Sequence, residues 1–442
     1  MRVCVVGAGG REHALARVLA RSAEVVVTPG NPGMAAGSPG ARPITTTAAP
    51  PEEVAADLYV VGPEVPLVGG LADRLRAAGR KVVGPGADGA RLEGSKAFMK
   101  DLLTRARVPT ARFGAFDRVD EARRFLRTLP GPWVVKTDGL AAGKGVLVAT
   151  SLAEAEADVE AKLSGSAFGD AGRRVVVEEG LTGRECSLLA LCDGRRAVPL
   201  VPARDFKRLA DGDEGPNTGG MGAYSPLPDV DRAVVEQIMD ESVEPLVAAL
   251  RARGIDYRGV LYAGLMLTDE GPKVLEFNVR LGDPEAQVVL PRLADDLAEL
   301  LMTVAEGRLG DPPRATPEAA VCVVMAAEGY PGPVRTGDPI DGLGPDGQLR
   351  DPLPGVTVFH AGTSGGPPGP FTTAGGRVLG VTAVAADVAD ARRLAYRAAA
   401  GIAWPGCQYR DDIAAAAQTD AATGAPAAAA AQGAADVGGG VR

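Results

Sequence analysis

The chain has 442 residues and a formal net charge of −9, from 47 basic and 56 acidic side chains. A chain of this length predicts about three domains of ordinary size. The acidic balance argues against a surface that binds nucleic acid or an anionic membrane, but it leaves room for a local basic pocket that takes a phosphorylated substrate. Glycine and proline supply 59 and 35 residues, so the question is where along the chain they stand.

The cysteines and histidines restrict the chemistry further. Five scattered cysteines without CxxC spacing predict reduced thiols in a cytoplasmic protein rather than a disulfide framework or a zinc site. His13 and His360 are the only histidines, which argues against a mechanism built on several imidazoles. The sequence offers neither an apolar run of about 18 residues nor a signal-peptide pattern, so we expect no membrane partner.

The first hundred residues alternate short apolar runs with helical spacing. Runs at residues 3–6, 25–27, 58–61 and 82–83 are typical of strands buried on both faces of a parallel sheet. Leucine and valine recur between these runs with the spacing of helices that pack on such a sheet. We therefore predict a Rossmann-like α/β domain over residues 1–103.

Two further units and a tail follow. Strand-like runs and glycine-rich turns over residues 104–310 indicate a mixed domain with a hairpin at residues 269–271. After a linker rich in proline and glycine, residues 317–413 predict a small α+β domain. The alanine-rich residues 414–442 lack a periodic face of large apolar side chains, which predicts a disordered tail.

Two glycine-rich turns follow the first two predicted strands. The turn at residues 7–10 precedes a helix, where backbone amides approach a phosphate most easily. It lacks the dinucleotide fingerprint, because Glu12 replaces the third glycine and no acid ends the second strand. The turn at residues 30–33 should lie at the same edge of the sheet. Plain strand–helix turns are the alternative, but together these two favour a small phosphorylated ligand over NAD.

A lysine and a glycine-rich loop separate the predicted strands at residues 133–136 and 146–149. Lys136 ends the first strand, and the loop at residues 139–145 carries Lys144. The spacing fails the P-loop pattern, yet such a loop can cover a triphosphate with amides and positive charge. The alternative is an edge lysine beside an ordinary hairpin.

A carboxylate and an amide alternate along the run at residues 274–280. Glu276, Asn278 and Arg280 should share one face of a strand. Carboxylate and amide oxygens suit Mg²⁺ that carries phosphates, and an arginine can neutralise a phosphoryl group in transfer. A solvated face with a Glu–Arg pair is the alternative. The positions in between are expected in the core: Leu275, Phe277 and Val279.

Four glycines crowd residues 215–222. Such a segment is costly to order and cannot help a regular element, which favours a binding loop over a linker. Asp205, Lys207 and Arg208 stand just before it and indicate a charged pocket.

Together these segments resemble the ATP-grasp superfamily, and within it the phosphoribosylamine–glycine ligase (glycinamide ribonucleotide synthetase) family. The resemblance covers residues 1–413, and it rests on residues 9–15, 92–100, 136–146, 215–226 and 276–285. It implies an ATP-grasp domain over residues 104–310 with a mobile lid at about 115–188. It also implies that ATP activates glycine as glycyl phosphate, from which 5-phosphoribosylamine displaces phosphate in purine biosynthesis. Mg²⁺ or Mn²⁺ would be the metal, and the enzyme would be a monomer.

The resemblance implies roles for individual residues as well. ATP would contact Lys100, Lys136, Gly139, Gly143, Lys144, Gly145, Glu178, Glu179, Leu181 and Glu185. The other substrates would contact Gly10, Arg11, Asn31, Gly33, Asn217, Thr218, Gly219, Gly220, Met221 and Asp283. Glu276 and Asn278 match the metal ligands, and Arg280, Asp205 and Lys144 would take part in catalysis.

Two positions depart from the pattern of the family, and two other functions stay open. Gly264 stands where many ATP-grasp enzymes carry another metal-binding acid, and Arg204 stands where this ligase family commonly has glutamine. One alternative is another ATP-grasp enzyme of the purine pathway, a carboxylase or a formate-using enzyme. The other is a non-catalytic nucleotide-binding or NAD-binding module, which only the turn at residues 7–10 suggests.

Overall fold

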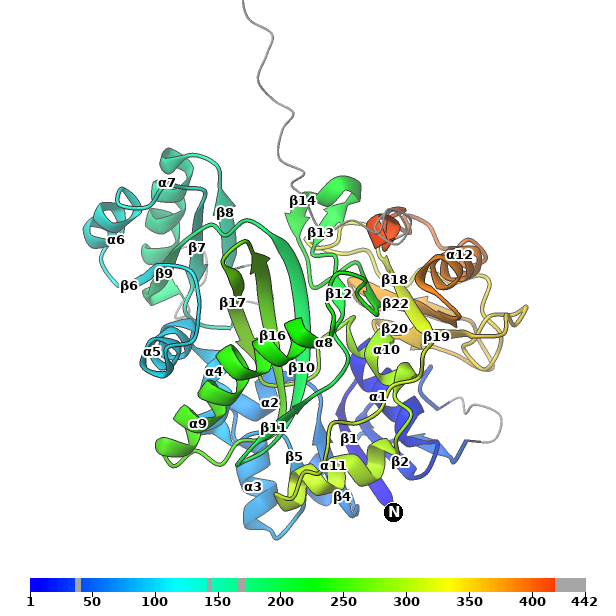
Figure 1. The fold of residues 1–442 in the computed structure, drawn as a ribbon. Helices are drawn as coiled ribbons and strands as arrows, with labels where there is room; N and C mark the ends of the chain where they lie inside the picture. Colours follow the sequence, from blue (N-terminus) through cyan, green and yellow to red (C-terminus); the bar gives the residue numbers. More distant parts are fainter. Residues whose placement is uncertain (36–40, 141–144, 166–171, 418–442) are drawn as a thin grey trace, which may run out of the picture.

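The computed structural model describes residues 1–35, 41–140, 145–165 and 172–417. In Figure 1 the N-terminal elements lie at the bottom, the sheet that contains β7 (Trp133–Thr137) lies at the upper left, and the C-terminal elements lie at the upper right. This mixed architecture with a parallel N-terminal sheet confirms the predicted fold class. Within the described ranges, no helix has the length and apolar character needed to cross a membrane.

The N-terminal sheet is parallel, with the strand order β3-β2-β1-β4-β5. Valines and leucines fill its two faces, which explains the continuous apolar runs in the sequence. Its strands are β1 (Arg2–Gly7), β2 (Glu24–Pro29), β3 (Ile44–Thr46), β4 (Leu58–Val61) and β5 (Val82–Val83). Its helices are α1 (Gly10–Leu19), α2 (Glu64–Val68) and α3 (Leu71–Ala77).

Two helices lead into a second sheet with the strand order β6-β9-β7-β8. The helices are α4 (Ala87–Gly94) and α5 (Lys96–Ala106); the Ser95 hydroxyl caps α5 by accepting a hydrogen bond from the Phe98 amide at 3.1 Å. The strands are β6 (Phe113–Phe116), β7 (Trp133–Thr137), β8 (Val146–Ala149) and β9 (Val175–Glu179), covered by α6 (Val119–Leu126) and α7 (Leu152–Leu163). Their buried side chains form a hydrophobic cluster separate from the two larger ones, so this part has its own core.

The third sheet is antiparallel, with the strand order β11-β10-β16-β17. Its strands are β10 (Arg184–Asp193), β11 (Ala197–Pro199), β16 (Arg258–Thr268) and β17 (Gly271–Asn278). The β16–β17 pair is the predicted hairpin. Before it, the helical stretch divides into α8 (Arg232–Ile238), a π-helical turn (Met239–Val243) and α9 (Glu244–Ala252).

The C-terminal sheet has the strand order β12-β15-β18-β22-β19 and joins segments that are distant in sequence. Its strands are β12 (Arg204–Asp205), β15 (Gly222–Ser225), β18 (Ala319–Ala326), β19 (Val356–His360) and β22 (Arg377–Ala385). β15 pairs with β18 across the linker that the sequence places between two domains. The sheet therefore ties the loop at residues 205–222 to the C-terminal part.

Shorter elements complete the described chain. The hairpins are β13 (Arg208–Ala210) with β14 (Glu214–Asn217), and β20 (Thr363–Gly365) with β21 (Phe371–Thr373). The remaining α-helices are α10 (Ala286–Val289), α11 (Leu297–Glu306) and α12 (Val388–Ala399), and 3₁₀ turns lie at Pro51–Glu53, Asp211–Asp213 and Leu290–Arg292. Ala414 and Ala417 are buried, so packing continues into the start of the predicted tail; residues 418–442 lie outside the described ranges.

Candidate active site

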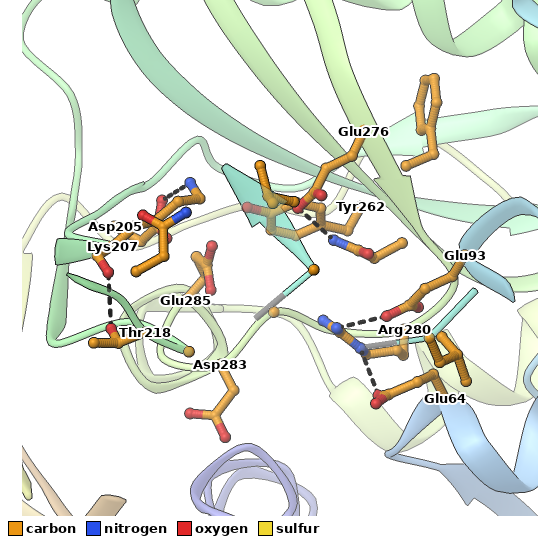
Figure 2. Close-up of a pocket in the computed structure, with 18 of the residues that line it drawn as sticks. Glu64, Glu93, Asp205, Lys207, Thr218, Tyr262, Glu276, Arg280, Asp283 and Glu285 are labelled. Atoms are coloured by element: carbon orange, nitrogen blue, oxygen red, sulfur yellow. Dashed lines mark hydrogen bonds and ion pairs between the residues drawn. The ribbon is translucent and has the colours of Figure 1, made fainter. Parts of the chain in front are cut away.

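A cleft of about 370 Å³ lies where the N-terminal, central and C-terminal parts meet. Figure 2 shows the acidic and basic side chains that converge on it from different elements. Ten of the predicted site residues line it: Arg11, Gly145, Asp205, Asn217, Thr218, Gly219, Glu276, Asn278, Arg280 and Asp283.

The predicted metal pair lies on β17. The Asn278 amide nitrogen donates to Glu276 Oε1 at 3.3 Å, which turns the amide oxygen away from that carboxylate. Burial opposes ionisation of Glu276, but Lys207, Lys136 and Lys96 hold its pKa below the usual value. The pair therefore presents a carboxylate and an amide oxygen, both hard ligands.

This donor set fits a divalent cation that is shared with substrate phosphates. The described residues contain no group of three or more His, Cys, Asp or Glu side chains placed to hold a metal by themselves. Mg²⁺ commonly takes one or two protein oxygens and completes its shell with phosphate and water, so a complete protein cage is not required. Gly264 pairs with Glu276, and a Cβ at that position would lie 3.2 Å from Glu276 Cγ.

A β-bulge on β17 corrects one sequence expectation. The pairing moves from Gly264 with Glu276 to Leu265 with Val274, so the side-chain alternation changes at Leu275. Val274 is fully buried and Phe277 is almost so, whereas Leu275 is only half-buried. The prediction that Leu275 enters the core is wrong. Its carbonyl instead accepts a hydrogen bond from Lys136 Nζ at 3.1 Å.

Arg280 is held by two carboxylates of the N-terminal part. Its guanidinium donates to Glu93 Oε1 at 2.6 Å and to Glu64 Oε2 at 3.2 Å (Figure 2). Burial alone would lower the pKa of Arg280, but Glu93 and Glu64 raise it above the ordinary value. Burial raises the pKa of the Glu93 carboxyl, against the opposing effect of Arg280. Arg280 thus remains a cation at the edge of the cleft, fixed in orientation.

Asp205 and Lys207 form a second charged group. Lys207 Nζ lies 2.8 Å from Asp205 Oδ1 and also contacts Glu185. Burial raises the pKa of Asp205, Glu285 and Glu276 add to this, and Lys207 opposes it. Asp205 is consequently a better proton acceptor than an exposed carboxylate.

Lys100, Lys136 and Glu178 form a buried group that does not line the cleft. Glu178 lies 3.0 Å from both ammonium groups, and the side chains of Lys100 and Glu178 are 0% and 2% exposed. Burial lowers the pKa of Lys100 to about 8 despite the nearby carboxylate. Lys100 also donates to the Thr110 hydroxyl at 2.7 Å.

Four other predicted ATP contacts lie at the ends of β7, β8 and β9 or just beyond them. The Glu179 carboxylate accepts a hydrogen bond from the Arg112 amide at 2.8 Å, and Leu181 is half-buried. The Gly145 carbonyl accepts one from the Thr137 amide at 2.9 Å, and the Gly139 carbonyl lies 3.5 Å from Lys96 Nζ. Gly143 and Lys144 lie outside the described residues.

The predicted substrate contacts divide into cleft residues and packed residues. Arg11 lines the cleft while it donates to the Leu281 carbonyl at 3.0 Å, and Gly10 begins α1 beside it. Asn31 and Gly33 are not in the lining. The Asn31 amide donates to the Ala8 and His360 carbonyls at 2.8 and 2.9 Å.

Gly33 and the end of the glycine-rich loop are also tightly packed. A Cβ at Gly33 would lie 2.1 Å from His360 Cγ, so this glycine permits close contact between the N- and C-terminal parts. Met221 is fully buried, and an added Cβ at Gly220 would lie 2.5 Å from Pro284 Cδ. Neither Gly220 nor Met221 is part of the cleft lining.

Several cleft residues were absent from the predicted set. Tyr330, Pro331 and Arg377 reach the cleft from the C-terminal part, and nothing in their local sequence indicates it. Arg377 pairs with Asp283 at 3.2 Å and donates to the Asp283 carbonyl at 2.7 Å. The charged segment at 205–208 did point to Lys207, whereas Glu285, which also lines the cleft, was not singled out.

Arg204 has a local structural role. It donates to the Glu185 carbonyl at 2.6 Å, to the Tyr224 hydroxyl at 2.9 Å and to Asp229 at 2.8 Å. These bonds anchor β12, the strand that also carries the cleft residue Asp205, so the departure from the family pattern leaves the strand in place.

Comparison with known proteins gives concordant matches. Models of the phosphoribosylglycinamide synthetase N, ATP-grasp (A) and C domains match residues 1–93, 94–286 and 320–416. The phosphoribosylamine–glycine ligase of Streptomyces coelicolor is 50% identical, covering 94% of this chain and 99% of its own. That of Escherichia coli K12 is 47% identical, covering 93% and 98%.

Solved structures agree. The phosphoribosylamine–glycine ligase of Thermotoga maritima has a TM-score of 0.79 at 34% identity, covering 93% of this chain and all (100%) of its own. A biotin carboxylase from Campylobacter jejuni has a TM-score of 0.68 at 14% identity and covers 92% of each chain, a likeness of fold alone.

Proposed function

This chain belongs to the phosphoribosylglycinamide synthetase family, and from that premise we propose that it joins glycine to 5-phospho-D-ribosylamine with the use of ATP. It is an ATP-dependent ligase of the ATP-grasp type. The products would be glycinamide ribonucleotide, ADP and phosphate, in de novo purine biosynthesis. The observation that carries the proposal is that the Glu276–Asn278 pair and Asp205 face one cleft together with the loop at residues 217–219.

The reaction would proceed in two steps. The glycine carboxylate attacks the γ-phosphorus of ATP, the bond to the β-phosphate oxygen breaks, and ADP leaves. The amine of phosphoribosylamine then attacks the carbonyl carbon of glycyl phosphate, the carbon–oxygen bond to phosphate breaks, and the amine loses a proton. Catalysis of both steps depends mainly on positioning and charge stabilisation.

Residues at the two ends of the cleft would serve these steps. A bound Mg²⁺ or Mn²⁺, held by Glu276 and Asn278, would neutralise phosphate charge. Arg280, oriented by Glu93 and Glu64, would contact the phosphoryl group in transfer. Asp205 would accept the amine proton, which its raised pKa supports.

The remaining contacts are assigned to the residues that match the motifs of the family. We assign the ATP phosphates to Lys100, Lys136 and the loop at residues 139–145, which includes Gly143 and Lys144. Glu178, Glu179 and Leu181 would border adenine, and Glu185 the ribose. Phosphoribosylamine would lie near Gly10 and Arg11, and Asn31 and Gly33 would support its site through packing. Asn217, Thr218 and Gly219, together with Asp283, would border glycine, and Gly220 and Met221 would anchor this loop by packing.

An omission assay tests the proposal. ADP release should require glycine, phosphoribosylamine and Mg²⁺ together, and the product should contain the new amide. Folded enzyme that forms no amide would refute the proposal. ATP turnover that depends on bicarbonate or formate, with glycine inert, would support the related purine-pathway enzyme instead. Tight NADH binding without ATP hydrolysis would support the binding module.

We also propose that the enzyme acts as a cytoplasmic monomer. The N-terminal, central and C-terminal parts of the chain together form the cleft, and all five cysteines are unpaired. Light scattering during size-exclusion chromatography should give the mass of one chain, and a dimer mass would contradict this.

A further inference from the structure

The last described segment of the chain packs against residues that lead into the cleft. Arg410 is 2% exposed, although it is an arginine. Its guanidinium lies 2.7 Å from Asp213 Oδ1, donates to the Arg208 carbonyl at 3.2 Å, and lies 4.9 Å from the centre of the Phe206 ring. One buried cation therefore contacts both ends of the segment at residues 206–213.

The two residues after Arg410 reinforce this contact. The Asp411 amide donates to Asp211 Oδ1 at 2.8 Å, and Asp412 Oδ2 accepts from the Gly212 amide at 2.9 Å. Asp412 also pairs with Arg410 at 2.6 Å. We call residues 410–412 the C-terminal clamp.

The clamped segment determines where the glycine-rich loop lies. The Lys207 carbonyl accepts hydrogen bonds from the Thr218 amide at 2.7 Å and its hydroxyl at 2.9 Å. The Phe206 carbonyl accepts one from the Met221 amide at 2.7 Å. A shift of Phe206 would therefore move the loop at 217–221 together with the Lys207 ammonium, which lies beside Asp205.

We propose that Arg410 is a positioning residue of this enzyme, which acts through Phe206 and Lys207 to hold the loop that borders glycine. The inference rests on the proposed function. Arg410 does not line the cleft, so its effect reaches the substrate only through the segment it clamps. A planar guanidinium can lie against the ring while its five N–H groups donate in fixed directions, an arrangement that the three rotatable N–H groups of a lysine ammonium do not reproduce.

Steady-state kinetics of Arg410→Lys test this role. The KM for glycine should rise about 10-fold and kcat should fall by a similar factor, while the KM for ATP stays within about 2-fold, because only the glycine side loses its alignment. Arg76→Lys is the matched control. Arg76 is half-buried, and its guanidinium donates to the Val82 and Gly84 carbonyls at 3.2 and 2.6 Å in the N-terminal part, away from the clamp and the glycine-rich loop. The control should lose stability without a selective change in the KM for glycine.

Amide hydrogen exchange supplies a readout that needs no turnover. The amides of Thr218 and Met221 should exchange at least 10-fold faster in Arg410→Lys than in the parent, and at the parental rate in the control. Phe206→Leu, which removes the ring but keeps apolar bulk, should act in the same direction and decides the matter if Arg410→Lys does not fold.

The possible failures are distinguishable. Unchanged exchange and an unchanged KM for glycine in a folded clamp variant would overturn the inference, as would equal changes in Arg76→Lys. A parent enzyme without glycine-dependent ADP formation would instead overturn the proposed function, and the exchange rates alone would then decide whether Arg410 holds the loop.

Discussion

Glu178→Gln removes the carboxylate that Lys100 and Lys136 share. Both ammonium groups lie 3.0 Å from it, and the side chains of Lys100, Glu178 and Lys136 are 0%, 2% and 8% exposed. Glutamine keeps the shape of the side chain but leaves two neighbouring buried cations without their counter-charge. The variant should therefore fold less stably and bind ATP less tightly.

The magnitude follows from these distances. At 3.0 Å and an effective dielectric constant near 20, each pair gains about 5.5 kcal/mol of Coulomb energy. Desolvation of the buried ions offsets much of this, and loss of one partner of a buried pair costs about 3–5 kcal/mol in practice. Loss of the carboxylate also lowers the pKa of Lys100 below its present value of about 8, so Lys100 loses charge near neutral pH.

Urea unfolding followed by tryptophan fluorescence can measure the stability change in the β6-β9-β7-β8 sheet, which carries Glu178. The chain has two tryptophans, and Trp133 packs against the small core of the β6-β9-β7-β8 sheet. A Trp404→Phe background therefore makes fluorescence report on this part alone. Glu178→Gln should lower its unfolding free energy by about 3–5 kcal/mol, and adding Lys100→Met should restore part of the loss. A loss below about 1 kcal/mol, or no recovery in the double variant, would refute the reasoning.

Three other variants probe the cleft and the domain contact. Glu276→Gln should lower kcat at least about 10²-fold and raise the Mg²⁺ concentration for half-maximal activity; an unchanged Mg²⁺ titration would contradict the ligand role. Gly33→Ala should cost about 1–3 kcal/mol by overpacking, since its Cβ would lie 2.1 Å from the His360 ring; parental thermal unfolding would contradict this. Burial lowers the pKa of His360 from 6.5 to about 4. The neutral imidazole therefore makes its full contribution to folding stability above pH 6.5, and this contribution is lost as the pH falls toward 4. In denaturant titrations, His360→Asn should reduce the loss of unfolding free energy at acid pH by about 3 kcal/mol. A stability profile against pH equal to that of the parent would exclude His360 as the cause of this loss.

Local pattern predicted much of the fold because burial leaves a direct trace in sequence. The valine runs of β1 and β2 are apolar at every position since both faces of their parallel sheet are covered. The Glu276–Asn278 pair was predicted because strand alternation puts them on one face. The same rule misplaced Leu275, because a bulge inserts a residue and reverses the alternation without an obvious sequence signal.

By itself, the sequence determined the alternating elements, the glycine-rich loops and the acidic and amide pair that suits phosphate chemistry, because each depends on residues within a few positions. Only the tertiary structure showed that Arg377 reaches the cleft, that Glu64 and Glu93 hold Arg280, and that Arg410 clamps Phe206. Those contacts join residues separated by about 94 to 216 positions or belong to side chains with no local pattern. Chain folding sets such distances through sheet pairing and packing, so spacing along the sequence carries no record of them.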